Sequence, residues 1–379
     1  MFGKIAAFEF RYQVKSPLFW VVAIIFFLLT FGSVTIDQIS IGGGGNIHRN
    51  APFAIAQTHL ILSIFYMFVT TAFVANVIVR DDETGFGPIL RSTQVSKFDY
   101  LYGRFTGAFA AAAVSFLAVP GAIALGSVMP WLDKETLGPL TLEPFLFSYV
   151  VLALPALLLT ASLFFTLATV TRSLMWTYVG VIALLVAWII AGIALDNPRF
   201  DKAAAYWEPF GTAAFGLVTK YWTAAERNAL TPALEGALLF NRLFSLSLSA
   251  GFLVLSYFLF RFQSGAQSGK KARRDTMSSI AAATAPPPPL AALPRPVFNA
   301  STAWRQLLAR TRLDMVQVFG SPAYGVLLFI GLSNALGGLW FAAEDNGYGG
   351  SIFPVTRVLI PTLMGTFGLI PIIISIYYA

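Results

Sequence analysis

The residues Arg80–Arg104 read RDDETGFGPILRSTQVSKFDYLYGR and carry eight formal charges in 25 residues. Long apolar runs without Asp, Glu, Lys or Arg lie on both sides of this stretch. Ionised side chains are costly inside a bilayer, so a charged segment between two membrane helices must lie in water. The sequence therefore predicts a membrane protein in which 80–104 is exposed and meets another protein.

The composition indicates the same class. Of the 379 residues, 57% are hydrophobic and 11% are charged, whereas soluble domains have about 25% charged residues. The net charge of +7 is explained by basic residues that collect on the cytoplasmic side of membrane proteins, so we expect no nucleic-acid partner. The chain has no cysteine, and its only histidines are His48 and His59. We therefore expect no metal site and no catalytic residues.

Apolar runs of about 20 residues, the length that spans a bilayer, predict an all-α integral membrane protein with eight membrane helices. The predicted spans are 18–36, 53–79, 102–129, 146–170, 174–195, 240–260, 323–343 and 358–379. Pro120 and Pro155 lie inside two of these spans and are expected to kink them. Gly103 and Gly107 have the spacing of small residues at close helix contacts, which favours internal packing over a dimer face.

Residues 2–15 are too polar to span the bilayer and form an amphipathic pattern. The apolar stripe consists of Phe2, Ile5, Phe8 and Tyr12. It is flanked by Lys4, Arg11 and Lys15, which predicts an interfacial helix lying on the membrane. With the N-terminus in the cytoplasm, 17 of the 25 Lys and Arg residues fall inside and 8 fall outside. The positive-inside rule therefore predicts a cytoplasmic N-terminus.

The segment 196–239 is the longest predicted external loop. Its mixture of aromatic and charged residues predicts one or two short helices lying on the outer surface. Arg242 follows it at the start of the sixth span, and two roles stay open for this residue. It either extends to the lipid head groups or forms an ion pair with an acid such as Glu226 or Glu235.

The segment 263–300 contains a basic cluster and the run Pro286–Pro289, which predicts a disordered cytoplasmic linker. Residues 301–379 then repeat the start of the chain. Ser321-Pro322 matches Ser16-Pro17, and each pair follows a basic amphipathic stretch and precedes a span. We expect the beginning of a second, homologous half with one interfacial helix and two spans. Because the chain ends inside the last predicted span, we expect it to be part of a longer protein.

The order of these features resembles one half of a known membrane protein family. After two spans, the cytoplasmic segment has the pattern acid-acid-Glu, Gly85, Leu90, Ser92, Val95-Ser96, Tyr100 and Gly103-Arg104, and four more spans follow. This pattern is similar to the six-helix half of type-2 ABC transporter permeases. The resemblance implies that 1–262 is one permease half and that 80–104 is the coupling segment, which docks in a groove of a separate ATPase.

The resemblance also implies which residues lie at or near the ATPase contact. They are Asp82, Glu83, Gly85, Leu90, Arg91, Ser92 and Lys97. ATP and Mg²⁺ would be held by the ATPase subunit, expected as a dimer, and not by this chain. A second permease half, in the same or another chain, would complete the membrane part.

Three further stretches indicate a narrower group. The opening FGKIAAFEFRYQVKSPLFW, the loop YWTAAERN and the pair Asn241-Arg242 are similar to bacterial inner-membrane proteins in which two such halves precede a zinc aminopeptidase-like domain. The resemblance implies a transport subunit, with export as the expected direction. The alternative is a membrane anchor for such a peptidase-like domain. An ion-driven transporter is disfavoured, because the predicted spans are nearly free of ionisable residues.

Overall fold

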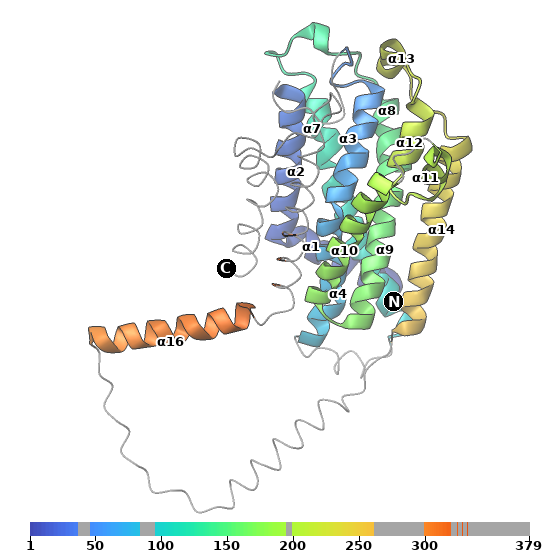
Figure 1. Cartoon of the computed structure of the whole chain (residues 1–379). Coiled ribbons are helices and arrows are strands. Elements are labelled where there is room, and N and C mark those ends of the chain that lie inside the picture. Colours follow the sequence, from blue (N-terminus) through green and yellow to red (C-terminus); the bar gives the residue numbers. More distant parts are fainter. Residues whose placement is uncertain are drawn as a thin grey trace, which may run out of the picture. The chain divides into compact units, whose positions relative to one another are not determined.

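The computed structural model describes residues 1–36, 46–83, 95–194, 199–260 and 299–319, together with Tyr324, Leu328 and Leu332. The expectation of an all-α protein is confirmed, because helices dominate and the described residues contain no strand. The chain divides into two compact units, Met1–Gly265 and Ala266–Ala379. The first unit is a helical bundle (Figure 1). In the second unit the described helix is α16 (Ala300–Phe319).

The long helices of the bundle run roughly side by side (Figure 1). They are α2 (Pro17–Thr35), α3 (Pro52–Phe65), α4 (Met67–Glu83), α6 (Lys97–Phe116), α7 (Ala118–Gly126), α9 (Leu154–Thr171), α10 (Leu174–Ala194) and α14 (Gly236–Leu259). The remaining helices of this unit are α1 (Phe2–Lys15), α8 (Leu142–Phe147), α11 (Asp201–Trp207), α12 (Thr212–Thr219) and α13 (Ala224–Ala229). A 3₁₀ turn covers Lys134–Thr136, and a π-helical segment covers Ser148–Ala153.

Four described helical stretches are long and apolar enough to cross a membrane. They are Pro17–Thr35, Lys97–Gly126, Leu142–Thr171 and Gly236–Leu259. The α3–α4 pair meets the same test as one span bent by 45°, which would make five. The fifth predicted span, 174–195, corresponds to α10, whose apolar part Leu174–Ile189 is shorter. The predicted spans 323–343 and 358–379 lie outside the described residues, apart from three single positions.

The proline positions explain part of the helix geometry. Pro155 is the second residue of α9, just after the π-helical segment Ser148–Ala153 that joins α8 to α9. Proline lacks an N–H donor and its ring clashes with the carbonyl four residues earlier, and a π-bulge is one way in which a helix absorbs such a defect. The break between α6 and α7 falls at Leu117, just before Pro120. The bend at Tyr66 between α3 and α4 has no proline within either helix interior to explain it.

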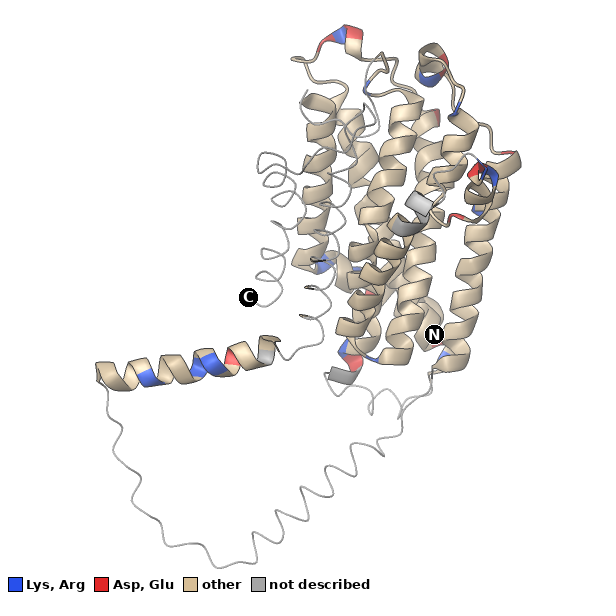
Figure 2. Cartoon of the chain, viewed as in Figure 1, with Lys and Arg blue, Asp and Glu red and all other residues tan. Residues whose placement is uncertain are grey.

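Charged residues gather at the two ends of the bundle, and the long middle section is mostly uncharged (Figure 2). One end contains α1, the last turn of α4 and the first turn of α6, and we call it the α1 end. The opposite end contains α13 and the start of α3, and we call it the α13 end (Figure 1). A dry middle section with charges at both ends is typical of a membrane protein.

Candidate functional site

The predicted ATPase contact lies at the α1 end, between α4 and α6. The backbone of Asp82 and Glu83 forms the last turn of α4, and Lys97 is the first residue of α6. The other four predicted contact residues, Gly85, Leu90, Arg91 and Ser92, fall in 84–94, outside the described residues. The structure therefore describes the two helix ends that hold this segment, and the site is built from them.

A buried network of charged side chains, which we call the ion cluster, joins these two helix ends to α1. It consists of Glu9 on α1, Arg80 and Asp81 on α4, and Arg104 on α6. The Nη1 atom of Arg104 lies 2.6 Å from Glu9 Oε2, and its Nη2 atom donates to both carboxylate oxygens of Asp81 at 2.9 and 2.7 Å. Arg80 Nη2 donates to the same oxygen of Glu9 at 3.0 Å. Two acids and two bases thus balance their charges across three helices.

The carboxylates of the ion cluster have further partners. Glu9 is completely buried, and Gln13 donates to its second oxygen at 2.9 Å and to the carbonyl of Phe73 at 3.2 Å. The Tyr100 hydroxyl donates to Asp81 at 2.7 Å. Every oxygen of both carboxylates therefore accepts at least one hydrogen bond, which a buried ionised group requires.

Close packing of α1 on α6 brings Glu9 to the ion cluster. Gly103 and Gly107 face α1, and a Cβ at Gly107 would overlap the carbonyl oxygen of Ala6 and lie 2.7 Å from Glu9 Cβ. The main-chain N–H of Phe2 donates to Asp99 in the first turn of α6 at 3.0 Å. The Gly103–Gly107 pair thus serves contact within the bundle, where missing side chains let the helices approach closely.

The prediction for α1 as an interfacial helix needs a correction. Lys4, Phe8, Arg11 and Lys15 share one exposed face, as an interfacial helix requires. However, α1 does not simply lie on a membrane surface, because its opposite face with Glu9 is buried against α6.

The predicted apolar stripe of α1 is divided between these two faces. Ile5 is half-buried near Gly103, whereas Phe8 is 59% exposed. Tyr12 is largely exposed, with the Arg80 guanidinium 4.1 Å from its ring. The prediction that all of 80–104 is exposed is wrong at both ends of the segment, because Asp81 and Arg104 are each only 5% exposed. The sequence signal for this burial is the position of Arg104 at the start of the predicted span 102–129, where a buried base needs a nearby acid.

Lys97 is turned toward the end of α14. Its Nζ atom lies 4.5 Å from the ring centroid of Tyr257 and 5.8 Å from that of Phe260. The guanidinium of Arg172, in the connection between α9 and α10, lies 5.0 Å from the Phe260 ring. Cation–π contacts of this kind fix the basic side chains over the aromatic rings. The first residue of α6 is therefore attached to the last turn of α14.

At the α13 end, both predicted roles of Arg242 are wrong. Arg242 is only 3% exposed, so it does not extend to head groups, and it forms no ion pair with the described carboxylates. Instead it donates to Asn241 Oδ1 and, at 3.2 Å, to the carbonyl of Leu152 in the π-helical segment. Glu226 is engaged in a capping box with Thr223, whose hydrogen bonds lower the pKa of the Glu226 carboxyl.

The external segment also differs from its prediction. The helices α11 and α12 do not merely lie on the outer surface, because Ala205, Phe210 and Phe215 are buried against the bundle. The turn between them is non-helical, and its backbone groups need partners at this depth. The side chains of Glu208 and Asn241 meet that need.

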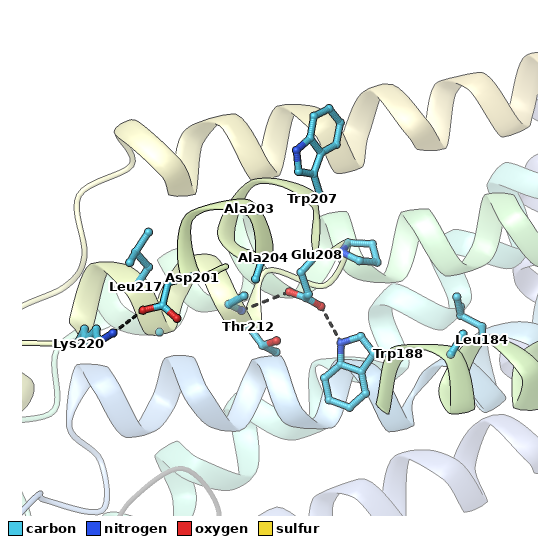
Figure 3. Close-up of a pocket in the computed structure, with 14 residues that line it drawn as sticks. Leu184, Trp188, Asp201, Ala203, Ala204, Trp207, Glu208, Thr212, Leu217 and Lys220 are labelled. Atoms are coloured by element: carbon cyan, nitrogen blue, oxygen red, sulfur yellow. Dashed lines mark hydrogen bonds and ion pairs between the residues drawn. The ribbon is translucent and has the colours of Figure 1, made fainter. Parts of the chain in front are cut away.

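Glu208, Asn241 and Trp188 hold the turn between α11 and α12. The Glu208 carboxylate accepts from the main-chain N–H groups of Phe210 at 3.0 Å and Gly211 at 2.6 Å. It also accepts from Trp188 Nε1 at 2.8 Å (Figure 3). Asn241 Nδ2 donates to the carbonyls of Ala205 at 3.0 Å and Glu208 at 2.7 Å. These hydrogen bonds thus fix the turn between α11 and α12 inside the bundle.

A cavity of about 800 Å³ lies between α10, α11 and α12. Trp188 and Trp207 contribute to its walls, and the ion pair between Asp201 and Lys220 lies at one edge (Figure 3). The sequence pattern of 196–239 did not reveal the cavity, because the cavity exists only through the packing of three separate helices. Among the described residues, no group of three His, Cys, Asp or Glu side chains is placed to hold a metal ion.

No family model matches this chain, and no curated protein matches its sequence. The functional conclusion therefore rests on the residues, the sequence pattern and the geometry of the two ends.

Proposed function

We propose that this chain is the permease subunit of an ATP-driven ABC-type exporter in a bacterial inner membrane. The observation that carries the proposal is the ion cluster, which joins both helices that bracket the predicted coupling segment. Arg80 and Asp81 precede that segment on α4, and Arg104 follows it on α6. A displacement of the segment by an ATPase is then transmitted to α4, α6 and α1 as one body, because separating buried ion pairs is costly.

The proposed mechanism uses energy from outside this chain. A partner ATPase, acting as a dimer, binds ATP and Mg²⁺, and its closure pushes on the coupling segment. The ion cluster passes this movement to α4, and the 45° bend at Tyr66 allows α4 to move relative to α3. The helices that line the substrate route are thereby rearranged. A second permease half, in the same or another chain, provides the other side of that route.

The exposed face of α1 supports a cytoplasmic N-terminus. Lys4, Arg11 and Lys15 lie beside Phe8 on this face, which fits a membrane surface with anionic head groups. The excess of Lys and Arg in the predicted inside segments agrees with this orientation.

Substitution of Glu83 tests the coupling role. In the complex purified with its ATPase and reconstituted in liposomes, Glu83→Ala is expected to leave the fold intact but to lower transport-coupled ATP hydrolysis sharply. Glu235→Ala is the matched control, because Glu235 is exposed at the α13 end and its side chain makes no capping hydrogen bond. Unchanged ATPase stimulation by Glu83→Ala would contradict the assignment. Purification without any nucleotide-binding protein would favour the membrane anchor.

A further inference from the structure

We propose that the cavity between α10, α11 and α12 binds the acyl chain of a zwitterionic phospholipid from the leaflet at the α13 end. This site goes beyond the proposed function, and it stands whether the chain works as a permease or as an anchor. Its volume of about 800 Å³ lies within the range of about 300–1,000 Å³ that is usual for small-molecule sites.

The walls of the cavity favour a hydrocarbon chain. Most of the lining side chains are apolar and include Leu184, Ala187 and Trp188 from α10, Ala204 and Trp207 from α11, and Leu217 from α12. Water molecules find few hydrogen-bond partners in such a cavity. Binding of an acyl chain is favourable, because it removes apolar surface of both the chain and the cavity walls from water. Glu208 does not provide a free charge for a ligand, because its oxygens already bond Trp188 and the backbone of the α11–α12 turn.

Trp207 places one wall of the cavity at the exposed surface of the bundle. Its side chain is 61% exposed, and its ring meets Phe240 and Phe244 of α14 edge-on, at centroid distances of 6.1 and 5.1 Å. Exposed aromatic side chains beside an apolar helix are typical of the membrane interface. A lipid in the adjacent leaflet can therefore place one chain in the cavity while its head group stays at the surface.

The charges at the edge specify the head group. Asp201 and Lys220 form a hydrogen-bonded ion pair, and both side chains are partly exposed, at 32% and 41%. The hydrogen bond and charge of Asp201 raise the pKa of Lys220, so the ammonium stays charged at neutral pH. Because the pair has no net charge, it does not favour an anionic lipid. A zwitterionic head offers the complementary pair, with its phosphate near Lys220 and its positively charged group, the quaternary ammonium in phosphatidylcholine, near Asp201.

Fluorescence quenching tests acyl-chain binding directly. The full-length chain, purified in a detergent without bromine, is titrated with phosphatidylcholine that carries brominated acyl chains. We expect saturable quenching of tryptophan fluorescence, and Trp188→Phe should remove much of the saturable part. Trp20→Phe is the control, because Trp20 is exposed on α2 and does not line the cavity. Quenching that never saturates would contradict a defined site.

A glycine substitution blocks the cavity without disturbing the fold. Gly216 on α12 lines the cavity, and a Cβ built there meets no atom within 4 Å. Gly216→Leu should therefore occupy the space of two or three methylene groups and weaken binding by about tenfold or more. Gly251→Leu on α14 is the matched control, since a Cβ there also meets nothing within 4 Å, and its affinity should equal that of the wild type. Equal affinity of Gly216→Leu and wild type would overturn the proposal.

Charge variants at the edge distinguish the head-group chemistry. Lys220→Gln and Asp201→Asn should each weaken phosphatidylcholine binding several-fold. With a brominated fatty acid as the probe, Asp201→Asn should instead strengthen binding, because it leaves Lys220 unopposed. If Asp201→Asn strengthens the binding of both probes, the zwitterionic specificity is wrong. None of these readouts depends on an ATPase, so their failure is separate from failure of the coupling role.

Discussion

Two buried arginines, one at each end of the bundle, have different kinds of hydrogen-bond partners. Arg104 is 5% exposed and contacts the carboxylates of Glu9 and Asp81 on two other helices. Arg242 is 3% exposed and donates to an amide oxygen of its neighbour Asn241 and to the main-chain carbonyl of Leu152. The guanidinium groups are equally hidden, but only Arg104 has acids as direct partners.

The two arginines therefore have different structural roles. Arg104 connects three helices, whereas Arg242 satisfies polar groups close to it. The ion cluster makes the positions of α1, α4 and α6 depend on one another, because each carries a charge that the others compensate. Arg242 and Asn241 instead satisfy carbonyl groups that the π-helical segment and the α11–α12 turn present inside the bundle. The α1 end is therefore suited to transmit movement, and the α13 end is suited to hold an irregular backbone in place.

Removing the arginine of the ion cluster should have the largest effect. Arg104→Met leaves Glu9 and Asp81 buried with one base fewer, and breaking a buried ion pair in this way costs about 3–5 kcal/mol. We expect a clearly lower unfolding temperature for the detergent-purified protein. Adding Glu9→Gln should recover part of the loss, since it removes one uncompensated charge. No recovery in the double variant would show that the charges of this cluster are not coupled.

The matching change at the α13 end should have a smaller effect. Arg242→Met removes donors to two neutral acceptors, for which an unsatisfied buried group costs about 1–3 kcal/mol. The same thermal measurement compares both variants under identical conditions. If Arg242→Met destabilises the protein as strongly as Arg104→Met, neutral and charged partners are equivalent here and the comparison fails.

The smallest expected difference in stability is between two tyrosine hydrogen bonds, one to a carboxylate and one to a main-chain carbonyl. The Tyr100 hydroxyl donates to the Asp81 carboxylate at 2.7 Å, and the Tyr149 hydroxyl donates to the Ala113 carbonyl at the same distance. Tyr100→Phe is expected to cost about 1.5 kcal/mol or more, and Tyr149→Phe about 1 kcal/mol, because bonds to charged groups are stronger. Unfolding temperatures of the two variants, each measured against wild type, check the order.

The sequence alone predicted those parts of the fold that depend on local composition. Long apolar runs predicted α2, α10 and α14 within a few residues, since only a helix satisfies its own backbone in a bilayer. Pro155 indicated an irregularity where the π-helical segment lies. The bend at Tyr66 was not predicted, because no residue there forces it.

The side-chain partners were harder to predict for a physical reason. The burial of Glu9 depends on the approach of α1 to α6, which joins residues 95 positions apart in the sequence. The partner of Arg242 at Leu152 is 90 positions away. An amphipathic pattern shows that a helix has two different faces, but it does not show which other helix packs against either face. The packing of α11 and α12 into the bundle was missed for the same reason.

The ion cluster also sets an order of events during synthesis of the protein. Glu9 leaves the ribosome 95 residues before Arg104, and the glycine surface of α6 that receives α1 is made at the same late stage. Until then α1 has neither the Arg104 guanidinium that neutralises Glu9 nor the glycine surface of α6 on which it packs. The first helix to be translated thus reaches its place only after α6 has been made, and an arrest of translation before residue 104 would leave it undocked.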